Sequence, residues 1–541
     1  MTGCKNKLFA AVLSLFSVTA ANAQEAVYLI PPVQLLPLKR METNAYGLSV
    51  GAETDVLNGR LWKNAAYPIT ASKFAKIRAN LPAAAENLRY RLLTLAAEPP
   101  QGTTGQSFIT LKLQQLFSLG YFDETYRLLR KIPEKIRTDE QNALYTRVLL
   151  LTDMQAACFS AAGNGAGDLS SQKMTAVCAA FNQEDEKAFT ALEIVKEQGG
   201  DDFVAAAVEH FLHGRPLTVL PEKVTPFTAA VWRKAGGNLA VLREKTDALW
   251  FKKMFVADDA VPAGTKLADA ERLVQHGLLP ASKLRQFYQQ IETGGNVPAN
   301  DGAFRALMIQ QAAALSSLSA DNLQKQDYLK QGMASAERAG LSYAFAAAAK
   351  DVLETLAPDA DTLAQSANLI EAFTLAGLNG KAAEWMTKAE LVFPASETAA
   401  EGWVFTEPFK ADKNSRFFIP ALENMMAFAE KNQAVDDAFI RRIDRLMLMF
   451  KTLDLLPADE RWHYSSFAEE SPEAVLAARG KTVLPANKPV GDTVLDALDA
   501  LDGSYAGLLN ALGLLTAAGL EREAVETAMQ SIGLIETAGG E

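Results

Sequence analysis

Apolar residues recur at spacings of three and four from about residue 71 onward, and Gly, Pro or Asn interrupts the pattern roughly every 12 to 20 residues. This periodicity is typical of helices joined by tight turns. The strict alternation of apolar and polar positions that marks strands is scarce. Residues 26–39 contain three prolines, which rule out a regular helix there. The pattern predicts a mostly α fold, an α-solenoid of stacked antiparallel helical hairpins with a short extended N-terminal arm.

Several predicted helices end at a glycine that is followed, five positions later, by a small residue. Such a glycine takes the left-handed conformation that stops the first helix, and the small residue lets the second helix cross closely over it. The pairs are Gly120 with Thr125, Gly377 with Ala382, and Gly519 with Ala524, and the turns at Gly277 and Gly340 are similar. These turns resemble those of tetratricopeptide-type helical hairpins. The resemblance covers only the turns and implies an α-solenoid without implying a ligand.

Breaks in the helical pattern suggest where the chain divides. Loop-like stretches rich in Pro or Gly lie at 215–226, 294–302 and 480–491. The predicted organisation is a signal peptide over 1–23, an extended arm over 24–64, a first helical array over 65–290, a second helical array over 302–479, and a C-terminal helical hairpin over 492–541.

The first 23 residues have the pattern of a secretory signal peptide. Lys5 and Lys7 precede an apolar run over 8–18, and small residues end at Ala23, after which we expect cleavage. An uncleaved membrane anchor is the alternative, although the run is shorter than the roughly 20 residues that cross a bilayer. No later segment is long and apolar enough to span a membrane, so we expect a periplasmic protein.

Two cysteines remain after the predicted signal peptide. Cys158 and Cys178 lie in helical-looking stretches on either side of a glycine-rich turn at 163–167. Two antiparallel helices would bring the thiols together, and an oxidising compartment would let them pair. We expect a disulfide, with two separate buried thiols as the alternative. A catalytic redox pair is disfavoured because no Cys-x-x-Cys motif is present.

The chain is acidic, with a formal net charge of -11. Nucleic acid binding requires concentrated Lys and Arg, and no basic run stands out from this background. We therefore expect no nucleic acid partner and no docking on anionic lipid, although a local basic face could exist once the chain folds.

Two serine motifs have an ordinary interpretation. Ser49 stands in a Gly-x-Ser-x-Gly pattern, but a poor helix former follows it and no alternating strands and helices follow. Ser170 and Lys173 fit the Ser-x-x-Lys pair of penicillin-binding enzymes, whose Ser-Asp-Asn and Lys-Thr-Gly companions are absent. We interpret the first as a glycine-flanked loop and the second as a helix start.

The four histidines do not form a recognisable metal motif. His210 and His213 could share a helix face, but Glu209 lies about 100° around it and no third ligand is evident. His276 stands in a predicted turn, and His463 stands between two aromatic residues. We expect no metal site and, without glycine-rich phosphate motifs, no cofactor.

Cell-wall cleavage is the catalytic alternative, because some lytic transglycosylases carry a long helical superhelix. Glu470 precedes Ser471, as in their catalytic context, but Pro472 follows and no Gly-Leu-Met-Gln segment occurs. The apolar helix predicted over 439–450 is interpreted as core, with a partner groove as the alternative. No complete catalytic motif is present, so we expect binding and not catalysis.

The chain also resembles a group of uncharacterised alphaproteobacterial periplasmic helical-repeat proteins. The likeness rests on the Leu-Trp segment at 59–62 and on the Glu-Gln-Gly turn at 197–199 after the cysteine hairpin. It implies compartment and fold, and no activity. Our hypothesis is a periplasmic helical-repeat scaffold that binds another cell-envelope protein, and the alternative is a peptidoglycan-binding or peptidoglycan-active factor with cell-wall contact.

Overall fold

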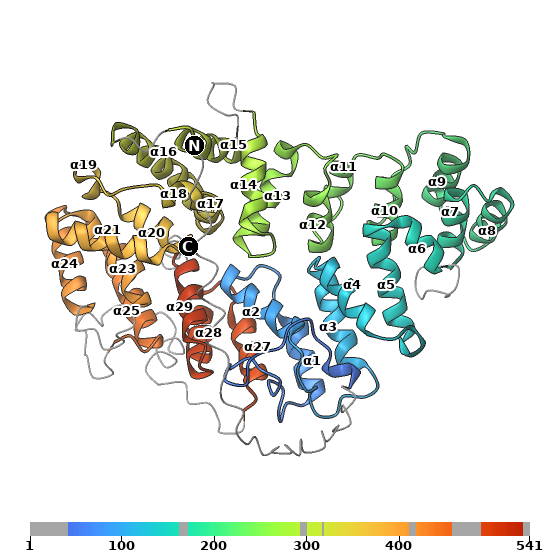
Figure 1. Cartoon of the computed structure of the whole chain (residues 1–541), viewed down its shortest axis with the longest axis horizontal. Helices are drawn as coiled ribbons and strands as arrows, with labels where there is room; N and C mark the ends of the chain where they lie inside the picture. Colours follow the sequence, from blue (N-terminus) through green and yellow to red (C-terminus); the bar gives the residue numbers. More distant parts are fainter. Residues whose placement is uncertain are drawn as a thin grey trace, which may run out of the picture. The chain divides into compact units, whose positions relative to one another are not determined.

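The computed structural model describes residues 42–161, 171–292, 300–315, 319–410, 418–456 and 488–533 (Figure 1). These residues are mostly helical, and the β-type pairings found among them are two isolated bridges. The predicted mostly α class is therefore confirmed. Within the same residues, no helix has the length and apolar character needed to cross a membrane. The predicted signal peptide and the predicted arm up to residue 41 lie outside the described residues.

The first part of the described chain forms short helices that follow one another closely. Their bounds are η1 Thr43–Ala45, α1 Tyr67–Lys76, α2 Ala83–Thr94, α3 Ser107–Ser118, α4 Phe122–Lys131, η2 Glu134–Ile136, α5 Asp139–Thr152, α6 Met154–Ala161, α7 Ser171–Phe181, α8 Asp185–Glu197, α9 Asp202–His213, α10 Pro226–Lys234, α11 Leu239–Arg243, α12 Leu249–Ala257, α13 Ala263–Gln275 and α14 Ala281–Gln290.

The second part continues in the same manner. Its helices are α15 Asp301–Ala314, α16 Ser319–Arg338, α17 Ser342–Ala348, α18 Lys350–Glu354, α19 Ala360–Leu363, α20 Ala367–Leu375, α21 Asn379–Val392, α22 Glu397–Glu401, α23 Trp403–Thr406, η3 Glu407–Phe409, α24 Phe418–Lys431, α25 Asp437–Thr452, α27 Val490–Ala500, α28 Tyr505–Ala517 and α29 Glu521–Gln530.

The glycine turns adopt the predicted backbone conformation. The φ angles of Gly120, Gly377 and Gly519 are 73°, 74° and 79°. At Gly120 the amide donates to the carbonyl of Phe117 at 2.9 Å, and the next amide donates to Leu116 at 2.9 Å, so the last carbonyls of α3 are satisfied. The small residues Thr125, Ala382 and Ala524 are all buried in the following helices. This part of the sequence prediction is confirmed.

One continuous hydrophobic core runs through the described residues, from Leu57 to Ile532. Trp62, Trp385 and Trp403 are among its largest fully buried side chains. Because successive helices contribute to the same core, each helix buries its apolar side chains against neighbouring helices.

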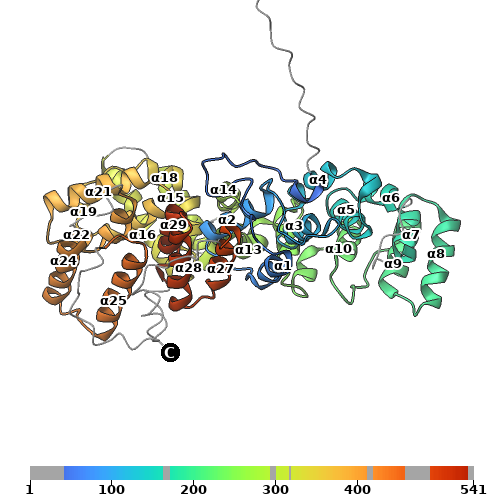
Figure 2. The same ribbon diagram turned by 90° about the horizontal axis from the view of Figure 1, so that it is seen from below.

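The first and last described helices pack against each other (Figures 1 and 2). α1 and α2 contact α27, and α2 also contacts α29. The amide of Gly491 donates to the carbonyl of Leu61 at 3.1 Å, and the buried hydroxyl of Thr70 donates to Asp492 at 2.9 Å. We call this contact the terminal interlock.

Ion pairs at the rim of the terminal interlock add to its buried contacts. The Nζ atom of Lys73 lies 2.8 Å from an Asp496 carboxylate oxygen, and Nη1 of Arg91 lies 2.6 Å from a Glu523 oxygen. These contacts join residues that are more than 400 positions apart in the chain. They are additional to the contacts between helices that follow one another in the sequence.

A buried ion pair joins α13 to α15. Arg305 and Glu271 are 3% and 2% exposed, and two nitrogens of the guanidinium lie 2.8 and 2.7 Å from the two carboxylate oxygens. The Tyr288 hydroxyl also donates to Glu271 at 2.6 Å, and Arg305 donates to the Ser335 hydroxyl at 3.3 Å. Each charge therefore has a partner away from water, which is the condition for keeping it buried.

Candidate functional site

The predicted cysteine pair lies between α6 and α7. The Sγ atoms of Cys158 and Cys178 are 2.07 Å apart, at disulfide distance, and their Cα atoms are 5.3 Å apart. Both side chains are buried. The glycine-rich turn expected between these helices lies outside the described residues.

The Gly-x-Ser-x-Gly segment lies along the end of α2. The amide of Leu48 donates to the Thr94 carbonyl at 2.6 Å, and the Ala96 amide donates to the Ser49 carbonyl at 2.8 Å. A Cβ atom at Gly47 would lie 2.1 Å from the Ala96 nitrogen, so glycine is needed for this close approach. Ser49 is exposed, and no helix begins directly after it. This agrees with the loop interpretation, because a nucleophilic serine of this motif stands on a sharp turn between a strand and a helix.

A buried lysine contacts the residue that precedes this segment and the end of α2. The Lys112 ammonium, whose side chain is 1% exposed, donates to the carbonyls of Tyr46 at 3.1 Å and Leu95 at 2.8 Å. Burial, with a smaller contribution from the charge of Lys131, lowers the pKa of Lys112 to about 7. Lys112 thus ties the first described residues to the end of α2.

Ser170 lies outside the described residues, and Lys173 lies in the first turn of α7. The Nζ atom of Lys173 lies 2.6 Å from Oδ2 of Asp201, whose other carboxylate oxygen accepts from the Val204 amide at the start of α9 at 3.1 Å. Lys173 therefore connects α7 to the N-terminus of α9.

The histidines make local contacts. His210 Nδ1 lies 2.8 Å from the Arg215 carbonyl, and the His213 ring stacks on Phe189 with 6.3 Å between centroids. His276 Nδ1 lies 2.9 Å from the Leu81 carbonyl, and burial lowers its pKa. In the part of the chain that is described, no group of three or more His, Cys, Asp or Glu residues could hold a metal ion. His463 and Glu470 lie outside that part.

A convergent group of ionisable side chains, which we call the Lys253 cluster, was not expected from the sequence. It consists of Glu86, Arg89, Tyr90, Tyr121 and Lys253, contributed by α2, the α3–α4 turn and α12. Glu86 and Arg89 form a fully buried ion pair, and the Tyr121 hydroxyl donates to Glu86 at 3.3 Å. The Lys253 Nζ atom lies 3.7 Å from the centroid of the Tyr121 ring, and the Tyr90 and Tyr121 rings are 5.0 Å apart.

Burial dominates the electrostatics of the Lys253 cluster. It raises the pKa values of Glu86 and Tyr121, since both would carry their negative charge away from water. Burial also lowers the pKa of Lys253 to about 8, although the charges of Glu124 and Glu86 oppose the shift. The carboxylate of Glu86 accepts from Arg89 and Tyr121, and that of Glu124 accepts from the Tyr90 hydroxyl at 3.3 Å, so the acidic groups near Lys253 take part in contacts between side chains of the protein.

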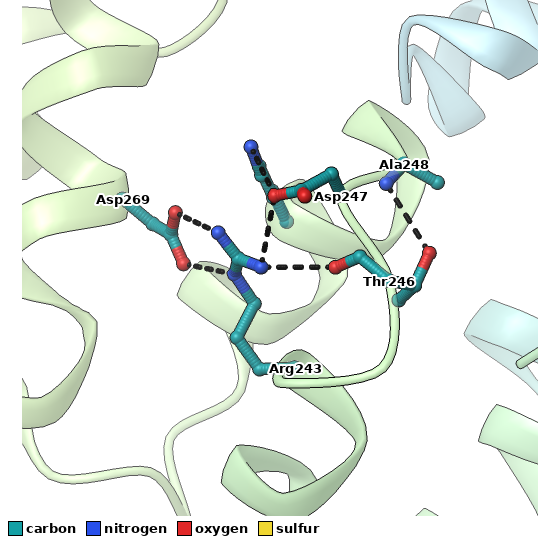
Figure 3. Close-up of polar contacts among 6 residues, drawn as sticks. Arg243, Thr246, Asp247, Ala248 and Asp269 are labelled. Carbon is teal, nitrogen blue, oxygen red and sulfur yellow. Dashed lines mark hydrogen bonds and ion pairs between the residues drawn. The ribbon is translucent and has the colours of Figure 1, made fainter.

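Two features position Lys253. A Cβ atom at Gly120 would lie 2.6 Å from Cδ of Lys253, so the glycine that ends α3 also leaves room for the lysine stem. The bidentate pair of Arg243 with Asp269, at 2.6 and 2.9 Å, joins the end of α11 to α13, and Nη1 of the same arginine donates to the Thr246 carbonyl at 2.9 Å, just before α12 (Figure 3). Asp247 accepts from Arg243 at 3.3 Å and lies 3.2 Å from Lys252 Nζ, and these contacts lower its pKa.

A second group, which we call the arginine–tyrosine face, lies on α4, α5 and the segment between them. The Tyr126 and Tyr145 rings stack with 5.7 Å between centroids and 14° between planes. The Arg130 guanidinium carbon lies 5.8 Å from the Tyr126 centroid, and that of Arg137 lies 4.7 Å from the Tyr145 centroid. All four side chains are at least partly exposed. No sequence motif marks this group, because its four members are brought together by the packing of α4 on α5.

Comparisons with known proteins add no assignment: no family model, no curated protein and no solved structure matches this chain.

Proposed function

We propose that this protein is an exported helical-repeat scaffold of the periplasm that binds another cell-envelope protein and carries out no catalysis. The observation that supports this proposal is that the described candidate reactive groups serve structural contacts. Lys173 holds the start of α9, and Glu86 of the Lys253 cluster is engaged by Arg89 and Tyr121. Reaction centres instead require a nucleophile, a base and an orienting group aimed at one substrate position.

The cysteine pair supports the compartment. Sulfur atoms at disulfide distance are expected in oxidising compartments and are rare in the cytosol. The signal-like pattern of residues 1–23 and the resemblance to periplasmic helical-repeat proteins also favour the periplasm.

The terminal interlock and the arginine–tyrosine face support a binding role. Helices that are held at both ends of the described chain present their side chains in a defined arrangement, which lowers the entropy lost on binding. Tyrosine and arginine are the side chains most enriched at protein interfaces. An α-solenoid of stacked hairpins provides such surfaces by its construction.

The test is to immobilise the chain from Gln24 to Glu541 and to crosslink it in extract of the bacterial envelope. We expect one protein to be enriched from the envelope and not from a cytosolic extract. Turnover of a cell-wall, ester or peptide substrate that disappears on a single substitution would refute the scaffold proposal. Co-sedimentation with isolated cell wall, without any protein partner, would favour the peptidoglycan-binding or peptidoglycan-active alternative.

A further inference from the structure

The arginines of the arginine–tyrosine face differ from several other arginines of the chain in what their guanidinium groups contact. Arg89, Arg243 and Arg305 are each paired with a carboxylate. Within the described residues, by contrast, Arg130 and Arg137 form no ion pair and contact the tyrosine rings instead. One further bond holds Arg137, whose Nε atom donates to the Ile132 carbonyl at 3.1 Å. Their charges are therefore not neutralised by a carboxylate in the described part of the protein.

Stacking on an aromatic ring leaves the edge of a guanidinium free. The planar group can contact the ring with its face while its N–H groups donate to a carboxylate in two parallel hydrogen bonds. Stacking also restricts the long arginine side chain before any ligand arrives, which reduces the entropy lost on binding. The two tyrosine rings stack on each other, and the Arg137 guanidinium, 4.7 Å from the Tyr145 centroid, contacts its ring more closely than that of Arg130, 5.8 Å from the Tyr126 centroid.

The surroundings of these side chains are basic in an otherwise acidic protein. Six basic and three acidic residues occur from Tyr126 to Arg147, whereas the whole chain has a net charge of -11. Burial, with a smaller contribution from Tyr126, raises the pKa of Tyr145, so neither tyrosine ring adds a negative charge to the face at neutral pH. The face therefore attracts a small acidic group, while the negative charge of the rest of the chain opposes an extended polyanion or an anionic membrane.

We propose that Arg130, Arg137, Tyr126 and Tyr145 bind an acidic segment of the partner protein, with one carboxylate on each guanidinium. This proposal rests on the scaffold function above and specifies the chemistry of the partner. The carboxylates approach the free edges of the guanidinium groups, and the tyrosine rings line the contact.

The test uses the chain from Gln24 to Glu541 and a fluorescent hexaglutamate peptide, with binding followed by fluorescence anisotropy. We expect saturable binding that weakens as salt rises, and no binding of hexaglutamine. Losing each charged hydrogen-bonding partner should weaken binding about tenfold, so R130Q/R137Q should bind about a hundredfold more weakly. The matched control is Arg522→Gln, which removes an exposed arginine that is paired with Glu526 at 2.9 Å and should leave the affinity unchanged.

Further variants separate stacking from simple charge. R130K/R137K keeps both charges but loses the planar groups, and we expect binding several-fold weaker than that of the wild-type chain. Wild-type affinity in either double variant would overturn the proposal, as would binding of phosphatidylglycerol vesicles or isolated cell wall in place of the peptide. Circular dichroism melting should show only a small loss of stability, of about 1 kcal/mol, because both side chains are at least partly exposed and only the Arg137 bond to Ile132 and the ring contacts are lost.

The same variants distinguish this inference from the function on which it rests. If R130Q/R137Q still captures the envelope partner, the scaffold stands and the assigned face is wrong. If the wild-type chain binds hexaglutamate but captures no protein, the face retains its chemistry and the scaffold function fails.

Discussion

Substituting Gly491 by alanine tests the terminal interlock. A Cβ atom at this position would lie 2.5 Å from two ring carbons of Trp62 and 3.1 Å from the Leu61 carbonyl oxygen. The Trp62 ring is 1% exposed and packs against Phe74 and Phe108, with 5.9 and 5.6 Å between centroids. The ring therefore has no free space into which it can move.

The expected magnitude follows from two opposing effects. Forcing a methyl group into a packed core costs about 1 to 3 kcal/mol, while replacing glycine by alanine in a helix returns up to about 1 kcal/mol. With the full offset, Gly491→Ala should thus lower the free energy of unfolding by up to about 2 kcal/mol. Gly380 is a matched control because it is also the second residue of its helix, and its Cβ atom would meet nothing within 4 Å. Gly380→Ala should raise the free energy of unfolding by up to about 1 kcal/mol.

Urea unfolding followed by circular dichroism measures both variants. The sign of the change should differ between them. If Gly491→Ala were as stabilising as Gly380→Ala, Trp62 and α27 could not be in contact, and the terminal interlock would be wrong. The double variant W62F/G491A should recover part of the loss, because the smaller ring makes room for the methyl group.

Three other perturbations have defined outcomes. Burial lowers the pKa of Lys112 from 10.5 to about 7, so between these values the unfolded chain binds more protons and this group makes stability rise with pH by up to about 1.4 kcal/mol per unit. Lys253 contributes a slope of the same sign above about pH 8, so Lys112→Met should reduce the slope without abolishing it, and an unchanged slope in urea titrations would contradict the assignment. Replacing Cys158 and Cys178 by serine should lower the free energy of unfolding by about 3 kcal/mol. In the wild-type chain, unfolded in denaturant, labelling of these two thiols should require a reductant. Glu271→Gln leaves the Arg305 charge buried without a full partner and should cost about 3 to 5 kcal/mol in urea unfolding, so a loss below 1 kcal/mol would argue against the buried pair.

Local chemistry made part of this protein predictable. The spacing of apolar residues indicates helices because a helix turn brings residues three and four apart onto one face. The glycines at 120, 377 and 519 mark helix ends because their left-handed conformation is costly for other residues, and the backbone angles there agree. The proximity of Cys158 and Cys178 could be expected because the sequence predicts two helices on either side of a glycine-rich turn.

The contacts between distant segments were decided by the tertiary structure. The Lys253 cluster joins residues 86 to 253, and the terminal interlock joins Leu61 to Gly491. The spacing of apolar residues along the sequence predicts neither contact, because it shows which face of a helix is apolar but not which other helix covers that face. Steric fit between the side chains selects the partner helix. Ser49 illustrates the converse, since its motif matches a nucleophile pattern while the backbone places it in a loop beside α2. The sequence alone determined that the chain is mostly helical and that helices end at the glycines of residues 120, 377 and 519, because those signals act within a few residues. Packing decided which charged and aromatic side chains meet, because that depends on the shapes of surfaces that the sequence places far apart.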